Sequence, residues 1–438
     1  MGNQVETVEN RENWGSRFGF IMAATGVAVG IGNIQRFPYL VGENGGAAFV
    51  VAYLIIMTFC TIPLTIMEIG AGHKFGKGVI DTYVDACRGK TAGKVLGGYI
   101  SIIPILLNMY YLCVITYVAY YIYSSFVGGW HDVDTTQLYN QVISSKGMLA
   151  GIFIGVCLLN SLIVFGGITN GIDKACRIMI PGVFLTLLIV LIRAAFLPGF
   201  GEGLKFFMSP DWSKLLDPNV WLAAAGQSMF SIGVGPGMMI VYGSHLKKDD
   251  DVNLNAVTIC FLDTAVAVLA GLAIVPATVA MGFDTETGPA LLFVVLPALF
   301  DRMAGGRILG VIFFLGVFFA GLSSSISHLE SPTSSFMDRF GWSRKKTVLI
   351  FTVIELIGGL ICCVTPSVYN FISAIAGDYF YSLSALISVI VFAYVYGAKK
   401  IRNYTNSISD IQVGRYYDIL LKFVACPVLA LVVLNMFI

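Results

Sequence analysis

Long apolar stretches recur along the whole chain and are separated by short polar segments. A membrane-spanning helix needs about 20 consecutive apolar residues, and such stretches occur from one end of the chain to the other. The expected spans are 15–40, 43–72, 92–127, 147–167, 173–197, 219–246, 252–282, 306–338, 344–363, 369–396 and 416–438. They are longer than the roughly 9–11 residues of a barrel strand, and they do not alternate apolar with polar positions. The pattern therefore predicts an all-α membrane protein with eleven transmembrane helices.

The composition supports a membrane protein. Of the 438 residues, 57% are hydrophobic and 12% are charged, whereas about 25% are charged in a soluble globular domain. Lipid must therefore cover apolar surface that a single soluble core cannot bury. The net charge of +1 argues against nucleic acid as a partner. The nine cysteines lie in or beside apolar stretches without metal-ligand spacing, and we interpret them as packing residues.

Basic residues predict how the chain is oriented. With the N-terminus inside, 20 of the 27 lysines and arginines fall on the inner side. Because cytoplasmic loops are enriched in these residues, we expect a protein of the cell membrane with a cytoplasmic N-terminus and an extracellular C-terminus. Residues 1–13 are polar and are expected to form a cytoplasmic segment without a cleaved signal peptide. The outer segment 283–305 is apolar enough to fold as a short helical lid.

The first span contains an unusual group of glycines and polar residues. Gly26, Gly30 and Gly32 interrupt it, and each glycine costs about 1 kcal/mol in a helix interior. One interpretation is close helix packing through small residues. The polar cluster at 33–36 (NIQR) favours a second interpretation, an unwound backbone that lines a binding site. Unwound backbone within a membrane is tolerated only where protein buries it or it lines a cavity.

The sixth span carries a matching interruption. Residues 231–237 (SIGVGPG) contain three glycines and a proline, so a continuous helix is not expected there. Five spans separate the starts of the two interrupted spans. Pairs of interrupted helices at matching positions are a known feature of transporters that are built from inverted repeats and bind their solute at the membrane midplane. The expected repeats are 14–197 and 219–396, followed by an additional span at 416–438.

Interrupted helices also predict the kind of solute. Carbonyl oxygens at one half-helix end suit a bare cation, whereas the N–H groups and positive dipole end of another suit a carboxylate. An amino acid carries both an ammonium and a carboxylate, and it would use both ends.

Four motifs resemble the neurotransmitter:sodium symporter family: GVAVGIGNIQRFPYL at 26–40, ENGGAAF at 43–49, the segment 226–237 and AGLSSSISHLE at 320–330. The resemblance extends from about residue 11 to the C-terminus, and the first motif is highly specific. It implies the leucine-transporter fold with spans 1 and 6 unwound at mid-membrane. The number of spans and the short tails are similar to the bacterial branch of the family.

The resemblance implies two bound sodium ions with oxygen ligands, which hard cations prefer. The first site would combine the substrate carboxylate with the Ala28 carbonyl, the Asn33 side chain, Ser231 and Asp263. The second site would use the carbonyls of Gly26, Val29 and Ala320 and the hydroxyls of Ser323 and Ser324. From the residues alone, the serine hydroxyls could equally bond back to carbonyls of their own helix.

Asp263 lies in an apolar stretch with no basic residue nearby in the sequence. An unpaired carboxylate there is costly, so it must be protonated, paired or bound to a cation. The family usually has asparagine at this position, and its chloride-dependent members bind the anion close by. An acidic residue would supply that negative charge itself, which predicts chloride independence. A protonated Asp263 that couples transport to protons is the alternative.

The resemblance also implies where the amino acid binds. The backbone N–H groups of Ile31 and Gly32 and the Tyr111 hydroxyl would hold the carboxylate, and the carbonyls of Ala28, Phe230 and Ser231 would hold the ammonium. The side-chain pocket would be lined by Leu107, Phe230, Gly233, Pro236, Ser324 and His328. The glycines leave room for large apolar substrates such as tryptophan. On the sequence alone, Tyr111 and His328 also fit ordinary packing roles.

The gating residues are also inferred from the resemblance. Arg36 is similar to the outer-gate arginine of the family. Its usual acidic partner falls on Ser373, so Asp378, five residues further on, is the candidate partner. The inner latch would consist of Arg11, Trp14 and Asp338. For Arg11 and Asp338, solvated surface charge is the alternative. In the fifth span, Gly171 and Pro181 would allow local unwinding on the inner side.

These features predict a symporter that imports hydrophobic L-amino acids, aliphatic and aromatic, with sodium and without chloride by alternating access. The alternatives are a transport-inactive amino-acid sensor and a proton-coupled amino-acid transporter that uses Asp263. A membrane enzyme is disfavoured because the chain has no HExxH or GxSxG motif and only four histidines. An ion channel is disfavoured because no repeated filter or gating-charge helix occurs.

Overall fold

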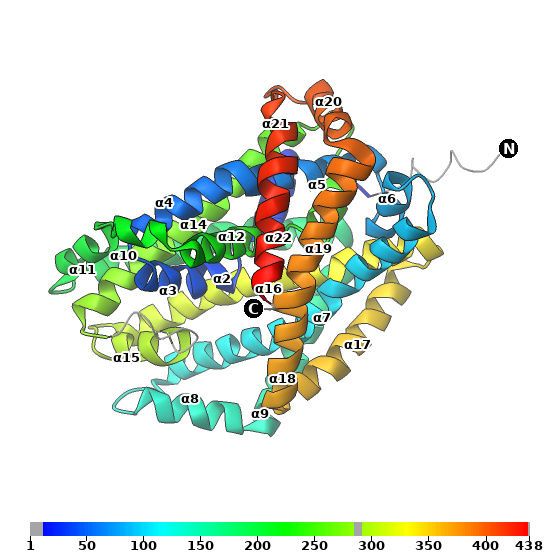
Figure 1. The fold of residues 1–438 in the computed structure, drawn as a ribbon. Coiled ribbons are helices and arrows are strands. Elements are labelled where there is room, and N and C mark those ends of the chain that lie inside the picture. Colours follow the sequence, from blue (N-terminus) through cyan, green and yellow to red (C-terminus); the bar gives the residue numbers. More distant parts are fainter. Residues whose placement is uncertain (1–11, 284–290, 437–438) are drawn as a thin grey trace.

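The structure, a computed structural model, describes residues 12–283 and 291–436, and within these ranges it is helical and contains no strand (Figure 1). In that part of the chain, nine helices are long and apolar enough to cross a membrane. A bent pair, Arg17–Ala28 with Ile31–Glu43, makes a tenth. The predicted all-α membrane fold is confirmed. The count of eleven spans stays a prediction, because the sixth expected span is divided into two shorter helices.

The first half of the chain contains these helices: α1 (Arg17–Ala28), α2 (Ile31–Ile34), α3 (Arg36–Glu43), α4 (Ala47–Ile56), α5 (Ile62–Phe75), α6 (Val79–Ala86), α7 (Thr91–Val127), α8 (Thr135–Ser144), α9 (Lys146–Phe165), α10 (Lys174–Ala195) and α11 (Phe200–Met208). A short π-helical turn at Met57–Thr61 joins α4 to α5. A second one at Ile168–Asp173 precedes α10. The second turn contains Gly171, where the sequence predicts a weak point in the fifth span.

The second half contains α12 (Pro218–Ile232), α13 (Met238–Ser244), α14 (Val252–Ala280), α15 (Leu296–Asp301), α16 (Gly306–Phe340), α17 (Arg344–Val364), α18 (Pro366–Ile372), α19 (Tyr381–Val389), α20 (Ala398–Ile408), α21 (Tyr416–Ile419) and α22 (Cys426–Asn435). Wider π-helical turns at Ser373–Phe380, Ile390–Gly397 and Leu420–Ala425 keep the last two expected spans continuous. Within the expected lid, α15 follows a turn at Leu291–Val295, and residues 284–290 lie outside the described part.

Backbone geometry explains both helix interruptions. Helix α1 ends at Ala28, and the next two residues, Val29 and Gly30, have extended backbones. Helix α2 begins at Ile31, and the two parts of the first span meet at an angle of 64°. Helix α12 ends at Ile232, and α13 begins at Met238. Between them the φ angles of Gly233, Gly235 and Gly237 are +80°, +114° and +81°. Only glycine adopts such angles without strain, so the glycines of this segment determine where the helix stops.

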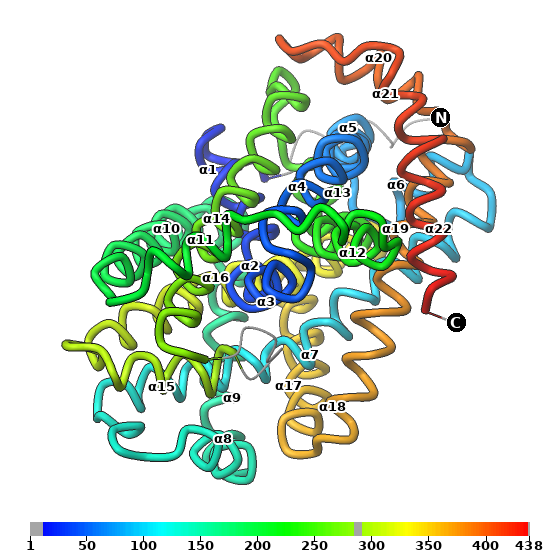
Figure 2. The backbone as a smooth tube through the Cα atoms, turned by 60° about the vertical axis from the view of Figure 1, so that its left-hand side comes forward, coloured from blue at the N-terminus to red at the C-terminus, as the bar shows by residue number. Residues whose placement is uncertain are grey.

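The interrupted helices lie at the centre of the bundle. Helix α2 contacts α12, α14 and α16, which Figure 2 shows around it. Helix α16 in turn packs along α7 and α10, and α13 packs against α5. Long uninterrupted helices therefore enclose the backbone groups that the breaks expose.

Candidate functional site

A small cavity lies where the two helix interruptions meet. Its volume is about 30 Å³, close to that of one water molecule. It is lined by Val27, Ala28, Gly30, Gly32, Asn33, Tyr111, Phe230, Ser231, Gly233, Met238, Ser324, His328 and Tyr381. Most side chains predicted to contact the amino acid therefore surround one space, which must widen to admit a solute of that size.

The predicted ligands of the first sodium site converge on Asp263, which is fully buried. Its Oδ1 accepts hydrogen bonds from Asn33 Nδ2 at 2.7 Å and from Ser231 Oγ at 2.8 Å. Its Oδ2 accepts a hydrogen bond from the Tyr53 hydroxyl at 3.2 Å. No lysine, arginine or histidine in the described ranges forms an ion pair with this carboxylate. The arrangement concentrates oxygen atoms and one negative charge beside the first helix break.

The predicted ligands of the second sodium site surround Ser324. Its Oγ lies 3.1 Å from the Gly26 carbonyl oxygen and 3.3 Å from those of Val29 and Ala320. A hydroxyl has one proton to donate and cannot satisfy three carbonyls, so the cluster is rich in unshared lone pairs. Ser323 bonds back to the Ala320 carbonyl at 3.0 Å, as the alternative interpretation of the serines expects. Such a group of neutral oxygens is suited to a bare cation.

The N-terminus of α2 faces Tyr111. The Ile31 N–H donates to the Tyr111 hydroxyl at 3.1 Å. A Cβ on Gly30 would lie 2.8 Å from that hydroxyl and 3.0 Å from Ser324 Oγ, so a side chain at this position would close the space. The Tyr111 ring meets the His328 ring edge-on, with centroids 5.5 Å apart. A carboxylate bound here would receive N–H and O–H donors together.

Two residues predicted to line the pocket do not line this cavity. Leu107 is buried in a cluster with Ile103, Tyr110, Ala376 and Tyr381, and Phe230 packs against that cluster. Pro236 is also buried outside the cavity wall.

The sequence did not single out several residues that the structure places at the site. Val27, Met238 and Tyr381 line the cavity, and Tyr53 contacts Asp263. Each stands in an apolar stretch where it looks like an ordinary packing residue. Glu68 was also missed, although an acid in an apolar span is a signal in itself. Its Oε1 accepts hydrogen bonds from the Gly235 N–H at 2.9 Å and from Ser388 Oγ at 2.7 Å, which holds the second break in place.

Two aromatic rings separate the central cavity from a larger vestibule. The Phe230 and Tyr381 rings lie 4.9 Å apart, and both residues line both spaces. The vestibule has a volume of about 670 Å³, and Arg36 and Asp378 are in its wall. No ion pair joins these two side chains in the described ranges, although they share this space.

The opposite end of the bundle is closed by the N-terminal segment. Trp14 is buried, and its Nε1 donates to the Tyr242 carbonyl at 3.0 Å. Glu12 accepts a hydrogen bond from the Thr169 N–H at 2.8 Å, in the π-helical turn before α10. Asp338 accepts a hydrogen bond from the Gly78 N–H at 2.6 Å. Arg11 lies outside the described residues, so its predicted latch contact stays a prediction.

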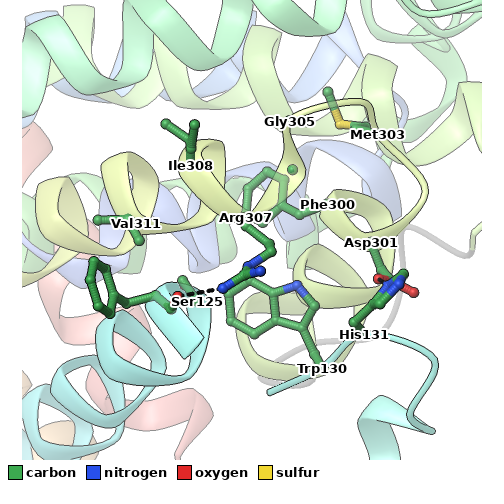
Figure 3. Close-up of a pocket in the computed structure, with 12 residues that line it drawn as sticks. Ser125, Trp130, His131, Phe300, Asp301, Met303, Gly305, Arg307, Ile308 and Val311 are labelled. Atoms are coloured by element: carbon green, nitrogen blue, oxygen red, sulfur yellow. Dashed lines mark hydrogen bonds and ion pairs between the residues drawn. The ribbon is translucent and has the colours of Figure 1, made fainter. Parts of the chain in front are cut away.

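A further cavity lies between the segment that follows α7 and the lid helix α15 (Figure 3). Its volume is about 560 Å³, and Trp130, His131 and Asp301 are among its lining residues. His131 Nδ1 lies 2.8 Å from Asp301 Oδ1, and its Nε2 lies 3.6 Å from Asp132 Oδ2. The hydrogen bond to Asp301, with the charge of Asp132, raises the pKa of His131 above its ordinary value.

This contact predicts a pH-dependent link between the outer loop and the lid. The pKa of His131 is raised in the folded protein. The contact therefore stabilises the fold fully at pH values below the unfolded-state pKa, and this stabilisation is lost as the pH rises through the folded-state pKa. We expect Asp301→Asn to lower the pKa of His131. An NMR titration of the His131 ring tests this, with exposed Glu202→Gln as the control. An unchanged titration in Asp301→Asn would contradict the assignment.

The fold and the site define a class of protein. Two interrupted helices meet at the centre of a helical membrane bundle and expose oxygen clusters and N–H groups to a small cavity, which is the arrangement of a secondary transporter. The chain matches the model of the sodium:neurotransmitter symporter family over residues 11–142 and 134–438. It belongs to that family, whose members are sodium-dependent transporters and not enzymes.

Several individual proteins are similar over most of the chain. A sodium-dependent transporter of Methanocaldococcus jannaschii, MJ1319, is 31% identical and aligns over 97% of this chain and 90% of its own. The human sodium- and chloride-dependent GABA transporter 2 is 26% identical over 89% of this chain and 74% of its own. The crystal structure of MhsT in complex with L-phenylalanine superposes with a TM-score of 0.87 at 32% identity, covering 98% of this chain and all of MhsT. MhsT is also the individual protein that the sequence motifs suggest.

Proposed function

We propose that this protein imports hydrophobic L-amino acids, aliphatic and aromatic, together with sodium by alternating access and without chloride. The main support is that Tyr111, which accepts from the Ile31 N–H, lines the same cavity as Asn33 and Ser231, which donate to Asp263 behind the cavity wall. The first group suits the carboxylate of an amino acid, and the second suits a sodium ion. A substrate carboxylate that touches both would tie the two fluxes together.

Two sodium ions fit the oxygen groups around the breaks. The first would bind among Asn33, Ser231 and Asp263, with the Ala28 carbonyl and the substrate carboxylate. The second would bind between the Ser324 hydroxyl and the carbonyls of Gly26, Val29 and Ala320, in place of the crowded hydrogen bonds that now join them. The Ser323 hydroxyl would be a further ligand. Because the first ion shares a ligand with the substrate, each raises the affinity of the other.

The walls of the cavity support an apolar substrate. Val27, Phe230 and Met238 present hydrocarbon, aromatic and thioether surface to the space. The similarity to MhsT, which binds L-phenylalanine, points in the same direction. The present volume of about 30 Å³ requires Phe230 and Tyr381 to move apart before such a side chain enters. These two rings would form the inner layer of the outer gate, with Arg36 and Asp378 above them.

Asp263 supports chloride independence. Its carboxylate supplies a fixed negative charge within hydrogen-bonding distance of Asn33 and Ser231, so a bound anion is not needed for charge balance. The alternative of a proton carried by Asp263 predicts uptake driven by a pH gradient in the absence of sodium. The alternative of a transport-inactive sensor predicts binding without uptake.

Alternating access would proceed between two five-helix repeats, 14–197 and 219–396, with the span at 416–438 outside them. The N-terminus would lie in the cytoplasm, the C-terminus outside, and the protein in the cell membrane. The inner latch of Arg11, Trp14 and Asp338 would release when the cavity opens inward. The π-helical turn at Ile168–Asp173, which Glu12 contacts, would let water reach the second sodium ion.

Uptake of labelled tryptophan, leucine and glycine into proteoliposomes tests the proposal. We expect tryptophan and leucine to accumulate under an inward sodium gradient, and glycine to accumulate far less. Replacing sodium with potassium should abolish uptake, whereas replacing chloride with gluconate should leave it unchanged. Uptake that does not depend on sodium, or uptake that stops when chloride is removed, would contradict the proposal.

A further inference from the structure

A second group of buried polar side chains lies away from the central cavity, between α7, α9 and α17. These three helices pack against one another in pairs (Figures 1 and 2). Helix α7 contributes Asn108, α9 contributes Asn160 and α17 contributes Glu355, and all three side chains are fully buried. None of them belongs to the sodium or amino-acid sites described above.

These side chains leave five polar atoms without hydrogen bonds. Both carboxylate oxygens of Glu355, both amide atoms of Asn160 and Nδ2 of Asn108 have no partner among the residues that the structure describes. Buried polar groups in native proteins are almost always satisfied, by protein, water or a bound ion. Five orphaned atoms in one region therefore indicate a missing polar partner.

Neighbouring contacts bring the three residues to the same place. Ser161, which follows Asn160, shares a hydrogen bond of 2.8 Å with Thr352, one helical turn from Glu355. The Asn108 amide lies close enough to the Glu355 carboxyl for a weak hydrogen bond, although its geometry falls outside ordinary limits. The thiol of Cys157, one turn from Asn160, also lies within electrostatic range of Glu355. The orphaned atoms of the three helices thus face a common region.

No lysine, arginine or histidine among residues 12–283 and 291–436 forms an ion pair with Glu355. The nearest basic residue of its own helix, Lys346, lies nine residues away, roughly 14 Å along the helix, and it is exposed with its Nζ over the Trp342 ring. Arg344 is already paired with Glu330 of α16, with contacts of 2.6 and 3.0 Å. The titratable groups that the adjoining helices bring near this region are thiols, Cys157 on α9 and Cys113 on α7. An ionised carboxylate buried without a partner is strongly unfavourable, so Glu355 must bind either a proton or a cation.

We propose that Glu355 and Asn160, with Asn108 beside them, form a third cation site, which binds a sodium ion. One carboxylate carries one negative charge, and a monovalent cation balances it where a divalent cation would leave an excess. The Glu355 oxygens and Asn160 Oδ1 are ligands of the kind that a hard cation takes, with water completing the shell. A proton on Glu355 would let the carboxyl donate one hydrogen bond, for example to Asn160 Oδ1, whereas a cation could gather the Glu355 oxygens and Asn160 Oδ1 together.

The site is connected to the transport machinery through α16. Asn108 Oδ1 accepts a hydrogen bond from Ser325 Oγ at 2.7 Å, and Ser325 is next to Ser324 in the chain. Occupancy of the third site would thus position the serine segment that forms the second sodium site. The inference does not depend on which amino acid is transported.

Thermal unfolding of the purified protein in detergent tests the proposal. The protein is compared in sodium chloride and in choline chloride at equal ionic strength, as wild type, Glu355→Gln and the exposed control Glu202→Gln. The same comparison is made in an Asp263→Ala/Ser324→Ala background, where the two central sites are disabled. We expect sodium to stabilise that background, and Glu355→Gln to abolish the remaining shift while Glu202→Gln keeps it.

The wild-type background provides the second measurement if the double variant does not fold. There, Glu355→Gln should reduce the sodium-induced rise in melting temperature, and Glu355→Leu should melt higher than wild type in choline because it removes the unpaired charge. If sodium raises the melting temperature of wild type and of Glu355→Gln by the same amount, the proposal is overturned. If the melting temperature depends on Glu355 through pH and not through sodium, Glu355 binds a proton, and the proposal is overturned as well.

Discussion

Asp263→Ala is expected to abolish sodium-driven uptake while leaving the protein folded. The carboxylate is the only fixed charge that contacts Asn33 and Ser231 in the described site. Two opposite unit charges about 4 Å apart interact by about 4 kcal/mol at an effective dielectric constant near 20, which is roughly a thousandfold in affinity. Uptake of labelled leucine into proteoliposomes, measured over a range of sodium concentrations, should show that loss.

Asp263→Asn is the matched variant for this prediction. It keeps the size of the side chain and one acceptor oxygen, and it replaces the charged carboxylate with a neutral amide. We expect its remaining activity to need chloride, because an anion bound nearby can replace the lost charge. If both variants transport leucine at wild-type sodium concentrations, Asp263 is not part of a sodium site. If wild-type uptake follows a pH gradient without sodium and Asp263→Asn loses that response, the proton-coupled alternative gains support.

Tyr111→Phe is expected to weaken amino-acid binding without loss of folding. The Tyr111 hydroxyl sits 3.1 Å from the Ile31 N–H, at the proposed position of the substrate carboxylate. A hydrogen bond to a charged group is worth about 1.5–3 kcal/mol, which corresponds to roughly a 10- to 150-fold loss in affinity. Equilibrium binding of labelled leucine in saturating sodium measures the change.

Tyr117→Phe provides the control on the same helix. Tyr117 packs against Phe293, with ring centroids 6.0 Å apart, and it does not line the central cavity. Its substitution should leave leucine affinity within about twofold of wild type, since surface and packing substitutions away from a site have small effects. Equal losses in the two variants would mean that Tyr111 acts through helix packing and not through its hydroxyl.

The positions of the helix breaks were accessible from the sequence because the backbone itself depends on glycine there. The positive φ angles of Gly233, Gly235 and Gly237 leave no other residue type without strain. The gathering of Asn33, Ser231 and Asp263 followed from the family resemblance, and the structure places these side chains in contact. Their role as sodium ligands stays a prediction.

Side-chain direction was less accessible. Leu107 and Pro236 were expected in the pocket but do not line the cavity, because the rotation of each helix decides which side chains face inward. Tyr53 and Tyr381 reach the site through a hydroxyl at the end of an aromatic ring, and in the sequence they resemble packing residues. Glu355 and Asn160 stand alone in apolar spans, so only the structure shows that they lie on neighbouring helices.

Coupling of the two fluxes depends on the substrate carboxylate completing the first sodium site. It is tested most directly by measuring leucine affinity against sodium concentration and sodium affinity against leucine concentration, on the same purified protein. We predict that each ligand raises the affinity of the other by the same factor, as linkage requires. Isoamylamine, which is leucine without its carboxylate, should leave sodium affinity unchanged. Equal enhancement of sodium affinity by leucine and by isoamylamine would contradict the account.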